Sequence, residues 1–204
     1  MAKSEPIRDP RKIEEMEDYY IAKKQFRNYV LFVLGTYTAL RISDLLSLQW
    51  KHIYNFNKKT FFSHLDITER KTEKTKKIAL HEDVIIALKF YLSILPNCTG
   101  ETWLFPSRKK ARPSISRQQA YRIIYEAARE VEIQGNISPH SMRKTLGYHA
   151  WKAGVSLTLI STLYNHASEK QTMVYCGITQ DEIDEVYLSQ NYRSKPRKVV
   201  SYEM

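Results

Sequence analysis

The segment Ser138-Pro139-His140-Ser141-Met142-Arg143 carries the sharpest chemical signal in the sequence. Serine followed by proline is typical of a helix start, which would place His140 and Arg143 on one face of the first turn. The free N–H groups and the positive dipole end of a helix start bind anions. Arg143 adds a planar guanidinium that matches two phosphate oxygens. The pattern indicates a phosphate site, and its plain alternative is a basic, solvated helix start.

Two further cationic positions stand out upstream. Arg41 follows an apolar run that ends at Leu40, where burying an unpaired guanidinium would be costly. Asp44 could orient it, so a structural Arg–Asp pair is the alternative to a functional arginine. Lys71 lies at the tip or edge of an expected hairpin, within a basic cluster that taken alone is typical of a solvated surface.

A histidine and a tyrosine near the carboxyl end complete the candidates. His166 lies in a polar turn, and Tyr175 follows nine residues later. The chain has 14 tyrosines, so any one of them is a weak candidate nucleophile by itself. An isolated histidine is more often a capping or packing residue. His166 and Tyr175 become credible site residues only together with the cationic positions upstream.

The sequence contains none of the common motifs for binding a metal ion or a nucleotide. The chain has no GxxxxGK[ST] loop, no GxGxxG turn, no HExxH and no paired CxxC. Residues 133–168 contain no Asp or Glu but several Lys, Arg and His. Because two-metal phosphodiester chemistry needs converging carboxylates, we expect no metal and no cofactor. A stretch without acids suits a bare phosphate.

Composition narrows the class of protein. The 204 residues carry 32 Lys+Arg against 22 Asp+Glu, a net charge of +10 that indicates a polyanionic partner, most simply nucleic acid. With 43% hydrophobic residues, wholesale disorder is excluded. Two cysteines exclude a disulfide framework. The sequence shows neither a signal peptide nor a stretch long enough to span a bilayer, so we expect no membrane association and a cytoplasmic location.

The elements that must position these residues are mostly helical. Capping residues, prolines and apolar spacing predict helices at Pro10–Tyr20, Phe26–Leu40, Ile42–Leu48, Val84–Leu95, Ser116–Val131, Ser138–Gly154, Ser156–Leu163, Ser168–Tyr175 and Gln180–Ser189. Alternating aromatic, β-branched and polar residues over 51–80 predict antiparallel strands. The expected fold class is α+β, mainly α-helical with a small three-stranded antiparallel sheet, in a single domain over residues 1–204.

Taken in order, the candidates resemble the catalytic domain of the tyrosine recombinases, the phage integrase family. That family has an arginine in a TGLRxSEL-like segment, a hairpin lysine, an HxxR, a histidine or tryptophan in an LGH-like turn, and then a tyrosine. The matching segments here are TALRISDL at 38–45, RKTEK at 70–74, HSMR at 140–143, NHAS at 165–168 and VYCGI at 174–178. The LFPS segment at 104–107 also resembles the family, and the similarity extends over roughly residues 6–190. Five motifs in one order argue against coincidence.

Three departures from the family pattern are visible. Ala39 replaces a glycine, which we expect only to tighten the turn, and Tyr164-Asn165 replaces Leu-Gly, which leaves His166 in place. The family normally has an N-terminal helical domain that clamps the far side of the DNA. This chain begins close to the catalytic domain, which fits either a truncated protein or a natural minimal one.

The resemblance implies metal- and ATP-independent chemistry at a DNA phosphate. Tyr175 would attack the scissile phosphate and form a 3′-phosphotyrosyl link. A phenol of pKa about 10 needs help to lose its proton. Arg41 and Arg143 would stabilise the phosphorane-like charge. The phosphotyrosine would keep the ester energy, so rejoining would need no ATP.

The remaining site residues take their roles from the same resemblance. His140 would be the general base or a hydrogen-bonding partner, and His166 would contact the phosphate or pack the site. Lys71 would protonate the departing 5′-oxygen as general acid. Lys74 is the alternative if the hairpin turn is shorter.

The implied partner is double-stranded DNA, bound by a homo-oligomer, a tetramer on DNA that is monomeric when free. Backbone contacts would come from Lys74, Arg108, Lys109, Lys110 and Arg112. Residues 179–204 would form a C-terminal helix and tail, docked either on a neighbouring subunit or on their own domain. We expect a bacterial or phage-encoded protein associated with the nucleoid.

The predicted function is therefore a site-specific recombinase, or integrase, of a phage or mobile element. Two alternatives stay open: a non-catalytic accessory DNA-binding relative, and a type IB topoisomerase-like enzyme that relaxes supercoils by the same chemistry.

Overall fold

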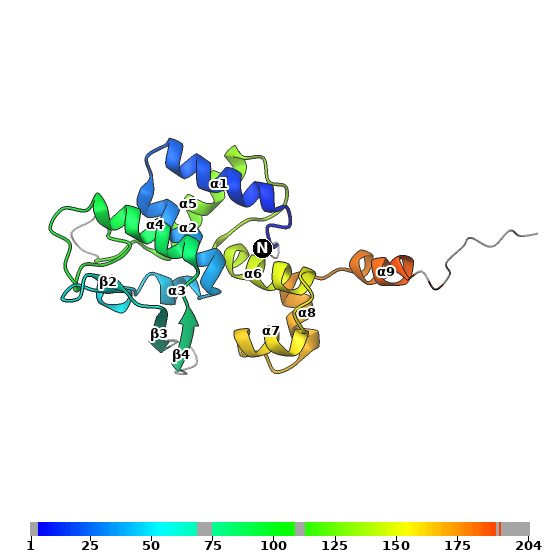
Figure 1. Cartoon of the computed structure of the whole chain (residues 1–204). Helices are drawn as coiled ribbons and strands as arrows, with labels where there is room; N and C mark the ends of the chain where they lie inside the picture. The colour runs from blue at the N-terminus through cyan, green and yellow to red at the C-terminus, as the bar shows by residue number, and fades with distance from the viewer. Residues whose placement is uncertain (1–3, 69–74, 109–112, 191, 193–204) are drawn as a thin grey trace, which may run out of the picture.

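The computed structural model describes residues 4–68, 75–108, 113–190 and 192, and helices dominate them (Figure 1). The helices are α1 (Pro10–Ala22), α2 (Phe26–Thr38), α3 (Ile42–Leu45), the 3-10 turn η1 (Trp50–His52), α4 (Glu82–Ser93), α5 (Arg117–Glu130), α6 (Pro139–Lys152), α7 (Leu157–Tyr164), α8 (Glu169–Cys176) and α9 (Gln180–Ser189). The strands are β1 (Tyr54–Asn55), β2 (Thr60–Phe61), β3 (His64–Thr68) and β4 (Thr75–Ala79). The mainly helical α+β class predicted from the sequence is confirmed.

The predicted helix starts are confirmed at their capping side chains. The Asp9 carboxylate accepts from the backbone N–H of Arg11 at 3.0 Å, ahead of proline at the first position of α1. Ser116 accepts from the N–H of Gln119 at 3.1 Å and opens α5. Capping boxes open α6 and α9. Because a capping oxygen pairs an otherwise unsatisfied N–H, these short motifs fix where each helix begins.

The strands depart from the predicted single three-stranded sheet. The described strands form two separate antiparallel hairpins, β1 with β2 and β3 with β4. The β2 strand has two residues, and Phe62 continues its register with β1 by donating its N–H to the Ile53 carbonyl at 2.9 Å. A two-residue strand offers too few backbone groups on its open edge for a second ladder, and among the described strands β3 pairs only with β4, over five residues. The fully buried Leu65 joins the second hairpin to the core.

Helix α2 is the spine of the core. Nine of its thirteen residues are buried, and it packs against α1, α4 and α6. A Cβ on Gly35 would lie 2.6 Å from the Met142 sulfur, so this glycine lets α6 approach α2 closely. That approach fixes the helix bearing His140 and Arg143 against the most buried element of the domain.

A smaller cluster joins α6, α7 and α8. Tyr164 and Cys176 are buried in it, and Tyr175 packs against it. A Cβ on Gly147 of α6 would lie 2.5 Å from the Tyr164 hydroxyl and 2.7 Å from the Cys176 sulfur. The absence of a side chain at Gly147 therefore lets the tyrosine-bearing α8 pack directly on α6.

The last described helix projects from the domain beyond α8 (Figure 1). Its first turn contacts the rest of the chain, whereas Val186, Tyr187 and Leu188 are 56%, 76% and 84% exposed. Among the described residues, no helix combines the length and apolar character that crossing a membrane requires.

Candidate active site

Arg143 is the most deeply buried of the predicted site residues that the structure describes, with 3% of its surface exposed. Its guanidinium donates to the carbonyl of Ala39, just after α2, and to the carbonyl of Tyr164 at 3.4 Å, at the end of α7. The same guanidinium lies over the Tyr164 ring at 4.9 Å from the centroid. These contacts hold a charged group in place where three helices meet.

The connection between α2 and α3 brings Arg41 to the same place. Ala39 ends α2 with φ +51°, in the left-handed region that favours glycine. Arg41 follows in extended conformation as the N-cap of α3, and its carbonyl accepts from Asp44 N at 2.9 Å. Alanine in the usual glycine position thus does more than tighten the turn. Ala39 itself adopts the left-handed conformation, and its carbonyl accepts a hydrogen bond from the Arg143 guanidinium.

Tyr175 lies half-buried among aromatic and cationic groups. Its ring is 5.0 Å from the Tyr164 ring and 4.9 Å from the His166 ring, and the Lys144 Nζ lies 5.2 Å above it. Burial raises the pKa of Tyr175, while the charge and hydrogen bonding of Arg143 and the charge of Arg41 lower it. The phenol is therefore protonated at neutral pH and lies in the field of both guanidiniums.

Both predicted histidines lie in that field. The His140 ring is exposed on the first turn of α6, and its pKa is lowered by partial loss of solvent, then by Arg143, Lys144 and Arg41. Burial, then Arg143 and Arg41 among its neighbours, also lowers the pKa of His166. The His166 Nδ1 lies 3.0 Å from the Thr172 hydroxyl. Both rings are thus neutral at pH 7 and can accept or donate a hydrogen bond.

The structure brings together Arg41, His140, Arg143, His166 and Tyr175 from four separate segments. Such a group, two guanidiniums beside a phenol and two neutral imidazoles, suits transfer of a phosphoryl group to the phenol. The other predicted residues Lys71, Lys74, Lys109, Lys110 and Arg112 lie outside the described part of the chain.

Arg108 lies elsewhere, on a groove of about 960 Å³ between the start of α2 and α5. The groove is also lined by Lys23, Lys24, Arg27 and Arg122. None of the five converging residues lines it. Burial, and to a lesser extent the charge of Arg108, lowers the pKa of Arg27. The groove is a second concentration of positive charge.

Two residues at the site did not emerge from the sequence. Tyr164 supports the arginine from both sides, because its hydroxyl donates to the Arg143 carbonyl at 2.5 Å and its own carbonyl accepts from the guanidinium. Lys76 of β4 donates to the Leu163 carbonyl at 2.7 Å, which ties the hairpin to α7. Its charge also lowers the pKa of His166. Tyr164 gave only a departure from the family pattern, and Lys76 only membership of a basic cluster.

Among the described residues there is no group of three or more His, Cys, Asp or Glu side chains that could hold a metal ion.

Comparison with protein families shows to which family the chain belongs. The model of the phage integrase family matches residues 9–182. The chain belongs to the phage integrase family, the tyrosine recombinases. The prediction of an enzyme of the tyrosine recombinase class is thereby confirmed at the level of the family.

Individual relatives agree with that assignment. The probable integrase/recombinase YoeC of Bacillus subtilis is 37% identical over 90% of this chain and 94% of its own length. The tyrosine recombinase XerD of Mycobacterium tuberculosis is 24% identical over 83% of this chain, and the match spans 53% of that relative. The chain thus spans nearly all of YoeC but about half of this longer relative.

Solved structures share the fold. A XerA recombinase superimposes with a TM-score of 0.70 at 20% identity, over 97% of this chain and 66% of that one. A XerH site-specific recombinase, solved as a post-cleavage complex with its difH substrate, superimposes with a TM-score of 0.69 at 18% identity. The match covers 92% of this chain and 53% of the XerH chain. At these identities the likeness shows the tyrosine recombinase catalytic-domain fold, as predicted.

Proposed function

We propose that this protein is a site-specific DNA recombinase that cleaves and rejoins DNA through a 3′-phosphotyrosyl intermediate. The observation that carries the proposal is the position of the Tyr175 phenol, which lies in the field of Arg41 and Arg143 and against the His166 ring. Family membership supports the reaction class, and the geometry of the described residues supports the proposed roles of Arg41, Arg143 and Tyr175.

In the proposed cleavage step, the Tyr175 oxygen attacks the scissile phosphorus and the bond to the 5′-oxygen breaks. Arg41 and Arg143 stabilise the charge on the non-bridging oxygens, and loss of one such donor typically costs about 3–4 kcal/mol of barrier. His140, neutral because its pKa is lowered, accepts the phenol proton or hydrogen-bonds to the phosphate. His166 packs the tyrosine.

The departing 5′-oxygen gains a proton from Lys71, with Lys74 as the alternative. In the rejoining step a 5′-hydroxyl of the new strand attacks the phosphotyrosine, and the phenol regains its proton. One ester replaces another in each step, so the proposed reaction uses neither ATP nor a metal ion.

The proposed substrate is double-stranded DNA. The net charge of +10 and the cationic groove beside Arg108 support it. Lys74, Lys109, Lys110 and Arg112 extend the proposed backbone contacts. Phosphate contacts of this kind set affinity and register but carry no direct sequence information.

We further propose that the protein assembles as a homo-oligomer, a tetramer, on DNA and is monomeric when free. The apolar side chains Val186, Tyr187 and Leu188 of α9 support an exchange of this helix between subunits, because they are exposed on the single chain. A cytoplasmic, nucleoid-associated protein of a bacterium or phage follows from the same proposal.

Covalent capture on a nicked suicide duplex tests the activity. The duplex carries a cognate core site, drawn from the DNA flanking the gene, and wild type should form a protein–DNA adduct that Tyr175→Phe does not. Tyr54→Phe is the control, because that ring packs against Phe61 in the first hairpin. EDTA should leave adduct formation unchanged.

The outcomes separate the candidate functions. If wild type and Tyr175→Phe bind the duplex equally and neither forms an adduct, the accessory DNA-binding alternative holds. Relaxation of a supercoiled plasmid that lacks the cognate site would favour the topoisomerase-like alternative.

A further inference from the structure

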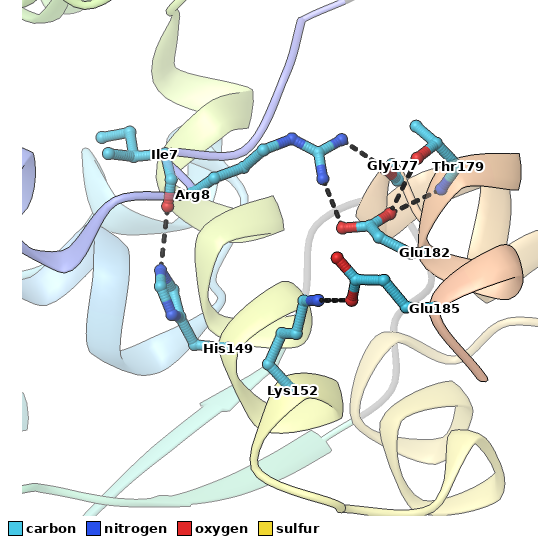
Figure 2. A network of polar contacts seen from close by, with 8 residues as sticks. All are labelled: Ile7, Arg8, His149, Lys152, Gly177, Thr179, Glu182 and Glu185. Atoms are coloured by element: carbon cyan, nitrogen blue, oxygen red, sulfur yellow. Dashed lines mark hydrogen bonds and ion pairs between the residues drawn. The ribbon is translucent and has the colours of Figure 1, made fainter. Parts of the chain in front are cut away.

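A short segment before α1, residues 4–8, lies across α6 and is called here the strap (Figure 2). The Ile7 N–H donates to the Thr145 hydroxyl at 2.9 Å, and the Ile7 carbonyl accepts from the His149 Nε2 at 2.9 Å. The Glu5 N–H donates to the Asn136 carbonyl at 3.1 Å. Ile7 itself is 1% exposed, so the strap is anchored by packing as well as by hydrogen bonds.

At the end of the strap, Arg8 joins α8 to α9 (Figure 2). Its Nη2 donates to the Gly177 carbonyl and its Nη1 to the Glu182 carboxylate, both at 2.6 Å. The guanidinium also lies over the Tyr148 ring at 4.8 Å. Glu182 is 7% exposed and accepts from the Thr179 N–H at 2.6 Å, so the same carboxylate caps α9.

Gly177 marks the end of the tyrosine-bearing helix, two residues after Tyr175. Its φ of +72° lies in the left-handed region, and a Cβ there would be 3.1 Å from the Pro6 ring and 3.5 Å from the Arg8 Nη2. The strap is therefore in contact with the residue that terminates α8. Because α8 has only eight residues, a shift at its end moves Tyr175 with it.

A second connection runs from the other end of the strap. The Lys144 Nζ donates to the Ser4 carbonyl at 2.6 Å, and the same atom lies 5.2 Å from the centroid of the Tyr175 ring. The two ends of the strap are thus connected to Tyr175 by different routes. Ser4 binds the Lys144 ammonium that lies over the tyrosine ring, and Arg8 binds Gly177 at the end of α8.

We propose that Arg8 is a positioning residue for Tyr175, which holds the phenol in register with Arg41 and Arg143 by fixing the end of α8 to the strap. This inference rests on the proposed function, because it assigns Arg8 a part in cleavage. A displacement of about 1 Å at a reacting group can lower a rate by about 100-fold, even when the changed residue is remote from the chemistry.

The test compares Arg8→Met with wild type in single-turnover cleavage at saturating DNA. We expect the cleavage rate to fall by about 10- to 100-fold, with the Kd for the duplex unchanged. Arg8→Lys should retain one of the two contacts and give an intermediate rate. A role in folding alone would lower the melting temperature and leave the rate of the folded fraction unchanged.

Two further variants guard against a trivial loss of structure. Arg11→Met is the matched control, because Arg11 is exposed and pairs only locally with Asp9 in the contacts described. Glu182→Gln keeps an oxygen to cap α9 but removes the charge that faces Arg8. It should lower the cleavage rate in the same direction as Arg8→Met, by a smaller factor.

A fluorine label at position 175 separates this inference from the proposed function. With 3-fluorotyrosine at 175, the ¹⁹F resonance of the DNA-free protein should shift or broaden in Arg8→Met and stay unchanged in Arg11→Met. If wild type forms no adduct, the proposed function fails, and an unchanged ¹⁹F resonance would independently overturn the positioning of Tyr175. If wild type cleaves and Arg8→Met cleaves at the same rate, the inference is wrong while the proposed function stands.

Discussion

At the scale of single residues, burial and the charges of two guanidiniums together set the protonation of the site. Burial, and then the charges of Arg143 and Arg41, lower the pKa of His140 and of His166, while burial raises the pKa of Tyr175. The result is a protonated phenol beside neutral imidazoles at pH 7. In the proposed reaction, that pairing would give the phenol a proton acceptor and leave the guanidiniums as the positive charges that face the phosphate.

The lowered histidine pKa values predict how stability depends on pH. In the unfolded chain both histidines have ordinary values near 6.5, so the unfolded state binds more protons as pH falls through that value. The contribution of these two histidines to the free energy of unfolding is therefore fully present above pH 6.5 and is lost as pH falls from 7 to 5. Glu17, whose pKa is raised to about 7 by burial and then by neighbouring carboxylates, contributes with the opposite sign over the same range. Urea unfolding at pH 7.5, 6.5 and 5.5 in a buffer without phosphate measures this slope.

A double variant identifies the source of the slope. His140→Gln with His166→Gln should remove the loss of stability that these two histidines cause toward pH 5, and should leave the contributions of His52 and Glu17. An unchanged slope in the double variant would show that these two imidazoles are not the groups being protonated.

At the scale of elements, the site depends on how closely α7 and α8 pack on α6. Gly147→Ala would place a methyl group 2.5 Å from the Tyr164 hydroxyl, which is itself bonded to the Arg143 carbonyl. The rigid ring has to move, so we expect a loss of about 1–3 kcal/mol in the free energy of unfolding. Adduct formation should also fall, because Tyr164 supports Arg143.

Gly35→Ala provides the comparison for that variant. Its new methyl group would meet the sulfur and terminal methyl of Met142, the flexible end of a side chain. Met142 can rotate away, so this change should cost less than Gly147→Ala in the same urea titration. Equal losses for the two variants would contradict a special role for the contact with Tyr164.

The elements also show how far the sequence carries a prediction. Helix starts were predictable because a capping side chain and its N–H partner are local, as at Ser116 and Ser168. The hairpins were not, because whether β3 pairs with β2 or β4 depends on where a two-residue strand ends.

The candidate site was predictable only as a pattern of motifs. The sequence names Arg41 and Tyr175, but their approach depends on the left-handed turn at Ala39 and on contacts of Arg143 with distant carbonyls. Tyr164 and the strap were missed for the same reason. Arg8 meets Glu182 across 174 positions, a separation that no local pattern encodes.

At the scale of the whole molecule, α9 is divided between its own domain and solvent. Residues 180–185 are tied in cis by the ion pairs of Arg8 with Glu182 at 2.6 Å and of Lys152 with Glu185 at 2.9 Å (Figure 2). The rest of α9 presents Val186 and Leu188 to solvent. The cis contact and the proposed docking on a second copy therefore use different parts of one helix.

Val186→Glu with Leu188→Glu tests that division. Both side chains are exposed in the single chain, so the melting temperature of the free protein and its affinity for one binding site should stay unchanged. On DNA with two adjacent sites, the slower-migrating complexes of a mobility-shift assay should be lost, because a charge replaces apolar area at the contact. Ser189→Glu with Gln190→Glu adds the same charge to the same helix without removing an apolar group. If both double variants assemble like wild type, α9 does not join the subunits.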